Sequence, residues 1–248
     1  MRRFFLSREF CREPVLQLTG REAHHAAHVL RAQRGEHLTV LDGAGGEYLC
    51  AVREVGRQDV TLEVLEKRQV PPPPLSITLL QALPKGRAFE FILEKATELG
   101  VRRIVPLISA RSISRPDEAG GRDKAEKWRL TLIEALKQCG APWLPELGAP
   151  VSLETFLARG ERFDLQWVAS LQPDALHPRE ALRQHRSRSA TPVQRAAVWV
   201  GPEGDFTPEE MRAIEAAGAI PVSLGSRVLR VETAVLCCLS ILNYELGS

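Results

Sequence analysis

The chain has 248 residues, of which 44% are hydrophobic, and this content can fill one large core or two modest ones. Lys and Arg total 33 against 31 for Asp and Glu, so the net charge of +2 excludes a general polycation. Five cysteines without CxxC spacing exclude a disulfide framework and favour a reducing compartment. Because no apolar run could span a bilayer or form a secretory leader, the sequence predicts a folded cytoplasmic protein without a membrane partner.

The first seventy residues predict a small β unit behind one helix. Thr19 and Glu22 have the spacing of a capping box, so the helix is expected to start at Thr19 and to end near Gly35. Between Glu36 and Leu65, hydrophobic residues alternate with other residues as they do in strands, and Asp42 to Gly46 is a cluster of turn-forming residues.

Four consecutive prolines, Pro71 to Pro74, mark the predicted domain boundary, because they continue neither a helix nor a central strand. Beyond them strands alternate with amphipathic helices, which predicts a parallel sheet in a three-layer α/β domain. Residues 172–194, which include an Arg/Ser-rich piece at 183–189, are interpreted as a helix fragment and a solvated loop. The expected strands are residues 75–80, 104–108, 165–169, 196–200 and 220–224, and the expected helices include 89–99 and 122–139.

Two strand–turn–helix segments lie near the C-terminus, VWVGPEGDF (198–206) and SLGSRVLRVETA (223–234). Their glycines allow bare backbone to approach a ligand, and ligands of parallel sheets bind at the carboxyl ends of the strands, where both turns fall. The two turns are therefore expected to form one pocket, although either alone could be an ordinary turn. Thr207-Pro208-Glu209-Glu210 predicts a capping box behind the first turn.

The chain contains neither GxxxxGK[ST] nor GxGxxG. Both motifs bind phosphates through a glycine-rich loop at the start of a helix. Their absence argues against a nucleoside triphosphate or a dinucleotide as cofactor, and it disfavours a dehydrogenase of doubly wound fold.

The segments GPEGDF (201–206) and SLGSRVLRVETA (223–234) resemble the C-terminal signature of RsmE-type 16S ribosomal RNA (uracil-N3) methyltransferases, which belong to the SPOUT class. The resemblance extends through residues 94–101 and 134–140 to His25 and residues 29–31. It implies a PUA-like, β-barrel RNA-binding domain over residues 1–70 and an α/β trefoil-knot domain with a parallel sheet over residues 75–248. It also implies a homodimer that methylates N3 of uridine in 16S rRNA of the small ribosomal subunit.

The same resemblance implies S-adenosylmethionine as cofactor, bound by backbone groups of three loops. From its position alone, Thr233 is expected rather to cap the last helix, which is apolar over more than half of its girth. The implied cofactor-binding residues are Leu171, Gly201, Pro202, Glu203, Gly204, Leu224, Gly225, Leu229, Val231 and Thr233.

Methylation at N3 of uracil requires that the imide proton leave, because the protonated nitrogen is a poor nucleophile. Arg230 is the candidate for stabilising charge on the uracil carbonyl oxygens, since its planar fork donates two hydrogen bonds. Glu232 is the candidate base. The alternative for both residues is a structural ion pair at the start of the helix, or a phosphate contact.

Basic residues in both parts of the chain are candidates for contact with RNA phosphates, and an ordinary solvated face is the alternative. They are Arg2, Arg3, Arg31, Lys85, Arg87 and Arg111. His24 and His28 stand one helical turn apart, but no acidic or cysteine partner lies near them in the sequence, so no metal site is predicted.

The sequence departs from the family pattern at four positions. Asp205 replaces a usual glycine, Ser226 a proline, Val231 a threonine and Ala141 an arginine. The first three lie at the cofactor turns. They support a rival interpretation, in which the protein is an RNA-binding ribosome assembly factor that has no catalytic activity. A SPOUT methyltransferase for another RNA target is the second rival.

Overall fold

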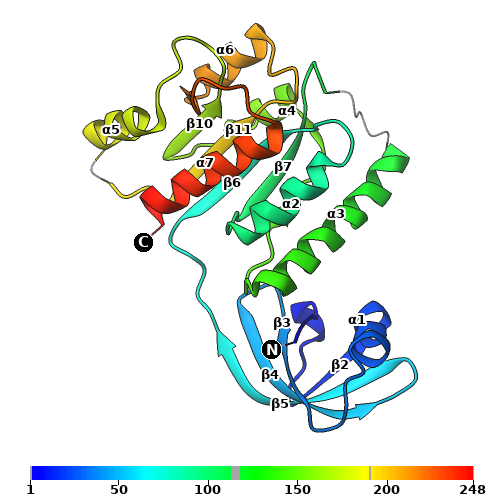
Figure 1. Ribbon diagram of the computed structural model, residues 1–248. Coiled ribbons are helices and arrows are strands. Elements are labelled where there is room, and N and C mark those ends of the chain that lie inside the picture. The colour runs from blue at the N-terminus through cyan, green and yellow to red at the C-terminus, as the bar shows by residue number, and fades with distance from the viewer. Residues whose placement is uncertain (1, 113–117, 190, 248) are drawn as a thin grey trace. The chain divides into compact units, whose positions relative to one another are not determined.

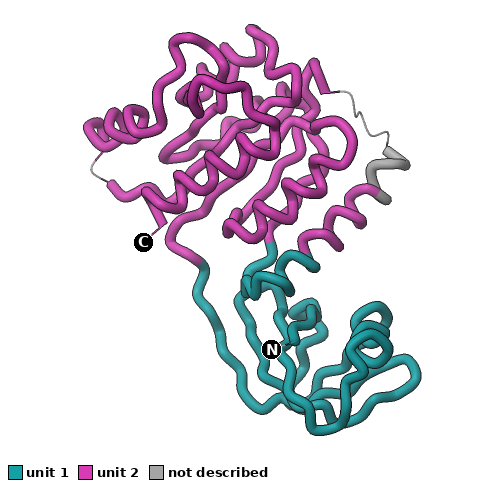
Figure 2. Tube along the Cα trace, viewed as in Figure 1, with its two compact units in different colours: residues 1–72, 133–144 teal, residues 73–132, 145–248 magenta. Residues whose placement is uncertain are grey.

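The computed structural model describes residues 2–112, 118–189 and 191–247 (Figure 1). The chain forms two compact units (Figure 2). The first consists of Met1–Pro72 with Ile133–Leu144, and the second of Pro73–Leu132 with Pro145–Ser248. The division therefore falls inside the proline run, and a later segment of the chain returns to the first unit. Within the described ranges, no helix is both long and apolar enough to cross a membrane.

The first unit is built on a five-stranded sheet with the order β1-β3-β4-β5-β2. Strand β1 runs parallel to β3, and the other pairings are antiparallel. Buried and half-buried residues alternate along the first half of β4, so one face of the sheet covers the core. The strands are β1 (Arg3–Phe5), β2 (Val15–Thr19), β3 (His37–Leu41), β4 (Gly46–Val55) and β5 (Asp59–Gln69).

The predicted helix of the first unit is shorter than expected, and its capping box is wrong. Helix α1 (Gly20–His24) continues as a π-helical turn, η2 (His25–Val29), and ends there; a 3₁₀ turn, η1 (Arg8–Phe10), precedes it. Thr19 is the N-cap residue, but its side chain makes no capping hydrogen bond. The Glu22 carboxylate accepts hydrogen bonds from the backbone N of Phe5 (3.1 Å) and from Nζ of Lys137 (2.8 Å) instead. Residues that are distant in sequence therefore bind the carboxylate that was predicted to cap the helix.

The returning segment of the first unit is the last part of helix α3 (Glu118–Cys139) and the residues after it. Ile133 and Leu136 pack in a small cluster with Phe5 and Leu41. Arg3 donates from Nη1 to the backbone oxygens of residues 137 (3.2 Å) and 138 (2.9 Å), which satisfies carbonyls at the helix C-terminus.

The second unit contains a seven-stranded sheet with the order β12-β10-β11-β6-β7-β8, and β9 also pairs with β7. Each pairing is parallel. The central strands are buried along nearly their whole length, as expected for a sheet covered on both faces. The strands are β6 (Ser76–Ala82), β7 (Arg103–Ile108), β8 (Glu146–Leu147), β9 (Val151–Ser152), β10 (Leu165–Ala169), β11 (Arg195–Val200) and β12 (Ile220–Val222).

The helices of the second unit cover this sheet (Figure 1). The last of them, α7, packs against α2 and β11, and Val235, Cys238, Leu239 and Leu242 are buried along it. The helix fragment predicted within residues 172–194 is α5, and the Arg/Ser-rich piece forms its last turns, where the Arg183 guanidinium donates two hydrogen bonds to Glu180. Besides the first part of α3, the helices are α2 (Ala88–Glu98), α4 (Leu153–Leu157), α5 (Pro178–Arg188), α6 (Pro208–Ala216) and α7 (Val231–Leu246).

Candidate functional site

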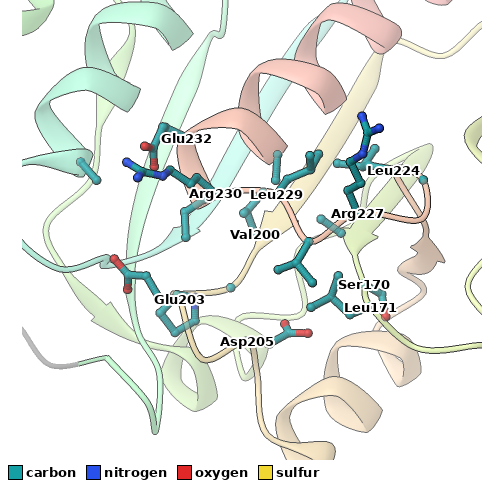
Figure 3. A pocket seen from close by; sticks show the side chains of 18 of the residues that line it. Ser170, Leu171, Val200, Glu203, Asp205, Leu224, Arg227, Leu229, Arg230 and Glu232 are labelled. Carbon is teal, nitrogen blue, oxygen red and sulfur yellow. The ribbon is translucent and has the colours of Figure 1, made fainter.

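A cavity of about 490 Å³ lies in the second unit, next to the carboxyl ends of three neighbouring strands of the sheet (Figure 3). Its walls come from the segments after β6, β10 and β11, and from the turn between β12 and α7. The predicted single pocket therefore exists, with one additional wall. The lining residues are Lys85, Ala88, Ala169, Ser170, Leu171, Val200, Gly201, Pro202, Glu203, Asp205, Leu224, Gly225, Arg227, Val228, Leu229, Arg230, Val231, Glu232 and Ala234.

The turn after β11 has no room for a side chain at its first glycine. A Cβ built on Gly201 would lie 2.8 Å from Oδ1 of Asp205 and 3.1 Å from both Cα of Asp205 and N of Phe206. The backbone of the turn is thus folded tightly against itself, and it faces the cavity without a side chain between. Gly201 is required here for close approach.

Asp205 occupies the left-handed region of the backbone, with φ of 59°. Asp is one of the few residues other than glycine that adopt this conformation at low cost. Its Oδ1 accepts a hydrogen bond from the backbone N of Phe206 (2.7 Å), and its own N donates to the oxygen of Pro202 (2.8 Å). The geometry explains both why glycine suits this position and how this chain accommodates Asp.

Helix α6 begins as the sequence predicts. The Thr207 hydroxyl accepts from the backbone N of Glu210 (3.2 Å), and the Glu210 carboxylate accepts from the backbone N of Thr207 (2.9 Å). Glu210 also accepts from the backbone N of Ala110 (2.7 Å) through its other oxygen. The capping box is confirmed, and it holds the residues just behind the first turn.

The turn after β12 is much more open. Gly225 has φ of 115° and no atom near the position of a Cβ, while Val228 is 79% exposed. Arg230 is the N-cap residue of α7, and its side chain makes no capping hydrogen bond. The side chains of this turn therefore stand around the cavity with few contacts to the rest of the unit.

Thr233 does not cap the last helix, so that prediction is wrong. Arg230 is the last extended residue (φ −65°, ψ 154°), and the helix begins at Val231. Thr233 is the third residue inside the helix and is exposed, and it does not line the cavity. Gly204 does not line it either; its oxygen accepts from Nη1 of Arg111, and a Cβ built on it would lie 3.3 Å from Cδ of that side chain.

Arg230 and Glu232 both line the cavity, at the start of α7 (Figure 3). Within residues 2–112, 118–189 and 191–247, neither side chain takes part in a hydrogen bond or an ion pair. The alternative of a structural ion pair between them is therefore not formed. Both polar groups are available to a ligand in the cavity.

Glu203 reaches from the turn after β11 to the segment after β6. Its Oε1 accepts a hydrogen bond from the backbone N of Lys85 (2.9 Å). This contact brings Lys85 and Ala88 to the cavity, which the sequence pattern did not predict. Ser170 and Val200 were also missed, although each is next to a predicted residue, and this adjacency was the only signal for them.

The residues predicted to contact RNA differ in what they already bind. Arg2 forms an ion pair with Glu36 (3.0 Å), Arg3 binds the end of α3, and Arg111 binds Gly204. Three others are exposed, and their side chains have no hydrogen bond or ion pair to any part of the chain described. They are Arg31, Lys85 and Arg87.

The cysteines and histidines form no second centre in the described residues. The five cysteines are free, and burial raises the pKa of Cys50 and of Cys238 to about 12, so both thiols stay protonated near neutral pH. The rings of His24 and His28 lie 4.9 Å apart. No group of three His, Cys, Asp or Glu side chains that could hold a metal is found in these ranges.

Comparison with known families agrees with this architecture. Residues 71–243 match the RNA methyltransferase domain, and residues 18–65 match the RNA methyltransferase PUA domain. The chain therefore belongs to the RNA methyltransferases. The predicted fold class, an α/β domain with a parallel sheet behind a PUA-like domain, is confirmed.

Individual relatives narrow the class. A ribosomal RNA small subunit methyltransferase E from Synechocystis sp. is 34% identical, over 95% of this chain and 75% of that protein. A solved Legionella pneumophila structure of a methyltransferase with bound S-adenosylmethionine is 32% identical with a TM-score of 0.87, covering 98% of this chain and 97% of that one. A solved structure of a Neisseria gonorrhoeae ribosomal RNA small subunit methyltransferase E bound to S-adenosylmethionine is 27% identical with a TM-score of 0.85. The match covers 99% of this chain and 98% of that one. The chain is a member of the ribosomal RNA small subunit methyltransferase E family.

Proposed function

We propose that this protein transfers a methyl group from S-adenosylmethionine to N3 of uridine in 16S rRNA of the small ribosomal subunit. The observation that carries the proposal is the cavity itself. The tightly folded backbone around Gly201 lines one wall, and Arg230 and Glu232, whose side chains have no partner among the described residues, line another. Membership of the family supports the substrate class.

The cavity suits a nucleoside cofactor. Its volume of about 490 Å³ lies in the usual range for small-ligand sites. Leu171, Val200, Leu224 and Val228 offer apolar surface to a flat ring, and the turn at Gly201 offers backbone groups. When bound, S-adenosylmethionine would supply a methyl group on a positively charged sulfur: N3 would form a bond to the methyl carbon, the carbon–sulfur bond would break, and S-adenosylhomocysteine would leave. Holding the donor and acceptor in line supplies much of the rate of such a reaction.

Arg230 is proposed to bind the uracil carbonyl oxygens. As the imide proton leaves, negative charge develops on these oxygens, and the guanidinium can donate its N–H groups to one of them, which leaves N3 open to the methyl group. No intramolecular acceptor among the described residues competes for this guanidinium. The side chain is exposed at the N-cap of α7, where an RNA base can reach it.

Glu232 is proposed to accept the imide proton. It lies in the first turn of α7, two residues after Arg230, and lines the same cavity. Its carboxylate has no bound donor in the described part of the chain, so both oxygens can receive a proton. In this proposal Glu232 removes the proton, and Arg230 stabilises the uracil anion that results.

The remaining parts of the proposal concern the assembly. Arg31, Lys85 and Arg87 are the candidates for phosphate contact, since each is exposed without a side-chain partner in the described residues. Family membership supports a cytoplasmic homodimer that acts on an assembled or nearly assembled small subunit.

The test is to incubate the purified protein with labelled S-adenosylmethionine and small ribosomal subunits that lack the native modification. The methylated nucleoside is then identified by mass spectrometry. N3-methyluridine in 16S rRNA is the expected product. A different methylated nucleoside would support methyltransferase activity but contradict N3 of uridine as the target.

Absence of transfer to subunits and to naked RNA would contradict the proposal and favour an RNA-binding assembly factor. Titration with S-adenosylmethionine separates these cases, because an assembly factor that has lost its cofactor site shows no saturable binding. The Asp205 departure does not by itself favour that factor, since the residue fits the backbone conformation of its turn.

A further inference from the structure

We propose that Asp205 is a further cofactor-binding residue, whose carboxylate accepts a hydrogen bond from a ribose hydroxyl of the bound nucleoside. This inference rests on the proposed function, because it takes S-adenosylmethionine as the occupant of the cavity. Glycine would adopt the backbone conformation of Asp205 without strain, so the conformation alone does not explain why this position has a carboxylate.

One carboxylate oxygen of Asp205 is committed and the other is not. Oδ1 accepts from the backbone N of Phe206 at 2.7 Å. Oδ2 has no hydrogen-bond partner among the residues that the structure describes, and it is not among the fully buried polar atoms without a partner. Since the residue lines the cavity, Oδ2 is accessible there to a donor from a ligand.

The surroundings of Asp205 make such a donor favourable. Burial raises the pKa of its carboxyl group, and the hydrogen bond from Phe206 and the charge of Arg111 oppose this rise. A half-buried carboxylate with one oxygen unpartnered in the described part of the chain is stabilised by a hydroxyl that donates to it, because such charge-assisted bonds are among the stronger ones.

The position in the cavity indicates which end of the cofactor meets this carboxylate. In Figure 3, Asp205 lies with Ser170 and Leu171, whereas Arg230 and Glu232 lie on the other side of the cavity. The transferred methyl group has to face the acceptor base beside Arg230 and Glu232. The side that holds Asp205 is therefore left for another part of the cofactor, and the apolar Leu171 beside Asp205 suits the nucleoside better than the charged methionine part.

The other two carboxylates of the cavity are placed for different tasks. Glu203 is exposed, accepts from the backbone N of Lys85 and lies away from Ser170 and Leu171, and Glu232 is at the acceptor side (Figure 3). Two neighbouring hydroxyls of a ribose are good donors to a carboxylate, as in other nucleotide-binding folds. Asp205 is the cavity carboxylate left to receive them among the residues described.

The experiment is calorimetric titration of the full-length wild type, Asp205→Asn and Asp205→Gly. Each is titrated with S-adenosylmethionine, S-adenosylhomocysteine, 5′-methylthioadenosine and 5′-methylthioinosine. Both replacements tolerate the left-handed backbone, and Asn keeps an oxygen for the N of Phe206. Glu209→Gln is the matched control, because it removes one negative charge from an exposed ion pair outside the cavity.

We expect both Asp205 variants to bind all four ligands roughly tenfold more weakly, the effect of losing one charge-assisted hydrogen bond, and the control to match the wild type. Unchanged affinities in the variants would overturn the inference. A loss confined to S-adenosylmethionine would place the carboxylate at the sulfonium, and unchanged binding of 5′-methylthioinosine would place it at the base amino group; each overturns the ribose assignment. If the wild type binds no S-adenosylmethionine, the proposed function itself fails.

Discussion

The two turns that line the cavity differ in how they are held. The turn after β11 is fixed by the hydrogen bonds of Asp205 and Glu203, by the absence of space at Gly201, and by the capping box behind it. The turn after β12 has exposed side chains, open space at Gly225, and a helix start without a side-chain cap.

This difference separates two tasks that a transferase must perform. A rigid turn presents backbone groups in one geometry, which suits a cofactor that every reaction cycle requires. An open turn leaves charged side chains for a substrate that arrives from outside. Changes in the first turn should therefore alter stability and cofactor affinity, and changes in the second should alter the rate of transfer.

The largest effect is expected for Arg230→Ala. Loss of one electrostatic stabiliser of the developing charge should slow methyl transfer by about 10²- to 10³-fold, or about 3–4 kcal/mol. Because Arg230 has no partner in the described part of the chain, the melting temperature and the affinity for S-adenosylmethionine should stay unchanged. Single-turnover kinetics and calorimetry measure these quantities. A parallel fall in stability would show that Arg230 is structural and would remove the distinction between the turns.

Glu232→Gln should slow transfer at neutral pH by about 10²-fold, because the amide cannot accept the imide proton. The pH dependence sharpens the prediction. The variant can use only uracil that has already ionised, so its rate should rise about tenfold per pH unit, whereas the wild-type rate should level off. Measurement of the transfer rate against pH checks this, and an unchanged rate and profile would eliminate Glu232 as the base.

Gly201→Ala tests the rigid turn. The new Cβ would lie 2.8 Å from Oδ1 of Asp205 and 3.1 Å from backbone atoms, so the turn has to move. We expect a loss of about 2 kcal/mol in the free energy of unfolding, together with weaker binding of S-adenosylmethionine. Gly204→Ala is the matched control, since its Cβ would meet only the flexible side chain of Arg111, at 3.3 Å. Equal effects of the two variants would contradict the description of this turn.

The smallest effect concerns a residue outside both turns, which serves as a reference for stability alone. Glu161 receives two hydrogen bonds from Arg103 (2.6 and 3.1 Å), and these lower its pKa below the ordinary 4.5. Glu161→Gln should cost about 1 kcal/mol of unfolding free energy at neutral pH without changing transfer at saturating substrates.

The sign of its pH dependence follows from the lowered pKa. The stabilisation is complete well above pH 4.5 and is lost as the pH falls through the pKa of the folded state. Denaturant unfolding of both proteins at several pH values should therefore show a difference that shrinks in acid. A difference that is independent of pH would indicate a packing effect.

Features that depend on neighbouring residues could be predicted from the sequence. Strand β10 covers Leu165–Ala169, the predicted range, because its apolar residues and its boundaries are local. The capping box of Thr207 and Glu210 lies within four residues. The composite pocket could also be predicted, since parallel strands bring the turns at their carboxyl ends to one edge.

Features that depend on residues distant in the sequence could not be predicted from the sequence. The pattern at Glu22 is that of a capping box, but Phe5 and Lys137 take its carboxylate. Lys85 and Ala88 reach the cavity because β6 is the neighbour of β11, and no periodicity specifies that strand order. Thr233 was misplaced because helix α7 begins without any side-chain cap to mark its start.

The membership of residues 133–144 in the first unit affects how the chain can fold while a ribosome makes it. Phe5, Leu41 and Arg3 find their partners only after the chain has been extended to residue 144, well into the second unit's sequence. A nascent fragment that stops at the proline run keeps apolar surface exposed and the Arg3 guanidinium without its carbonyls. The first unit therefore cannot be completed before the chain has been made as far as residue 144.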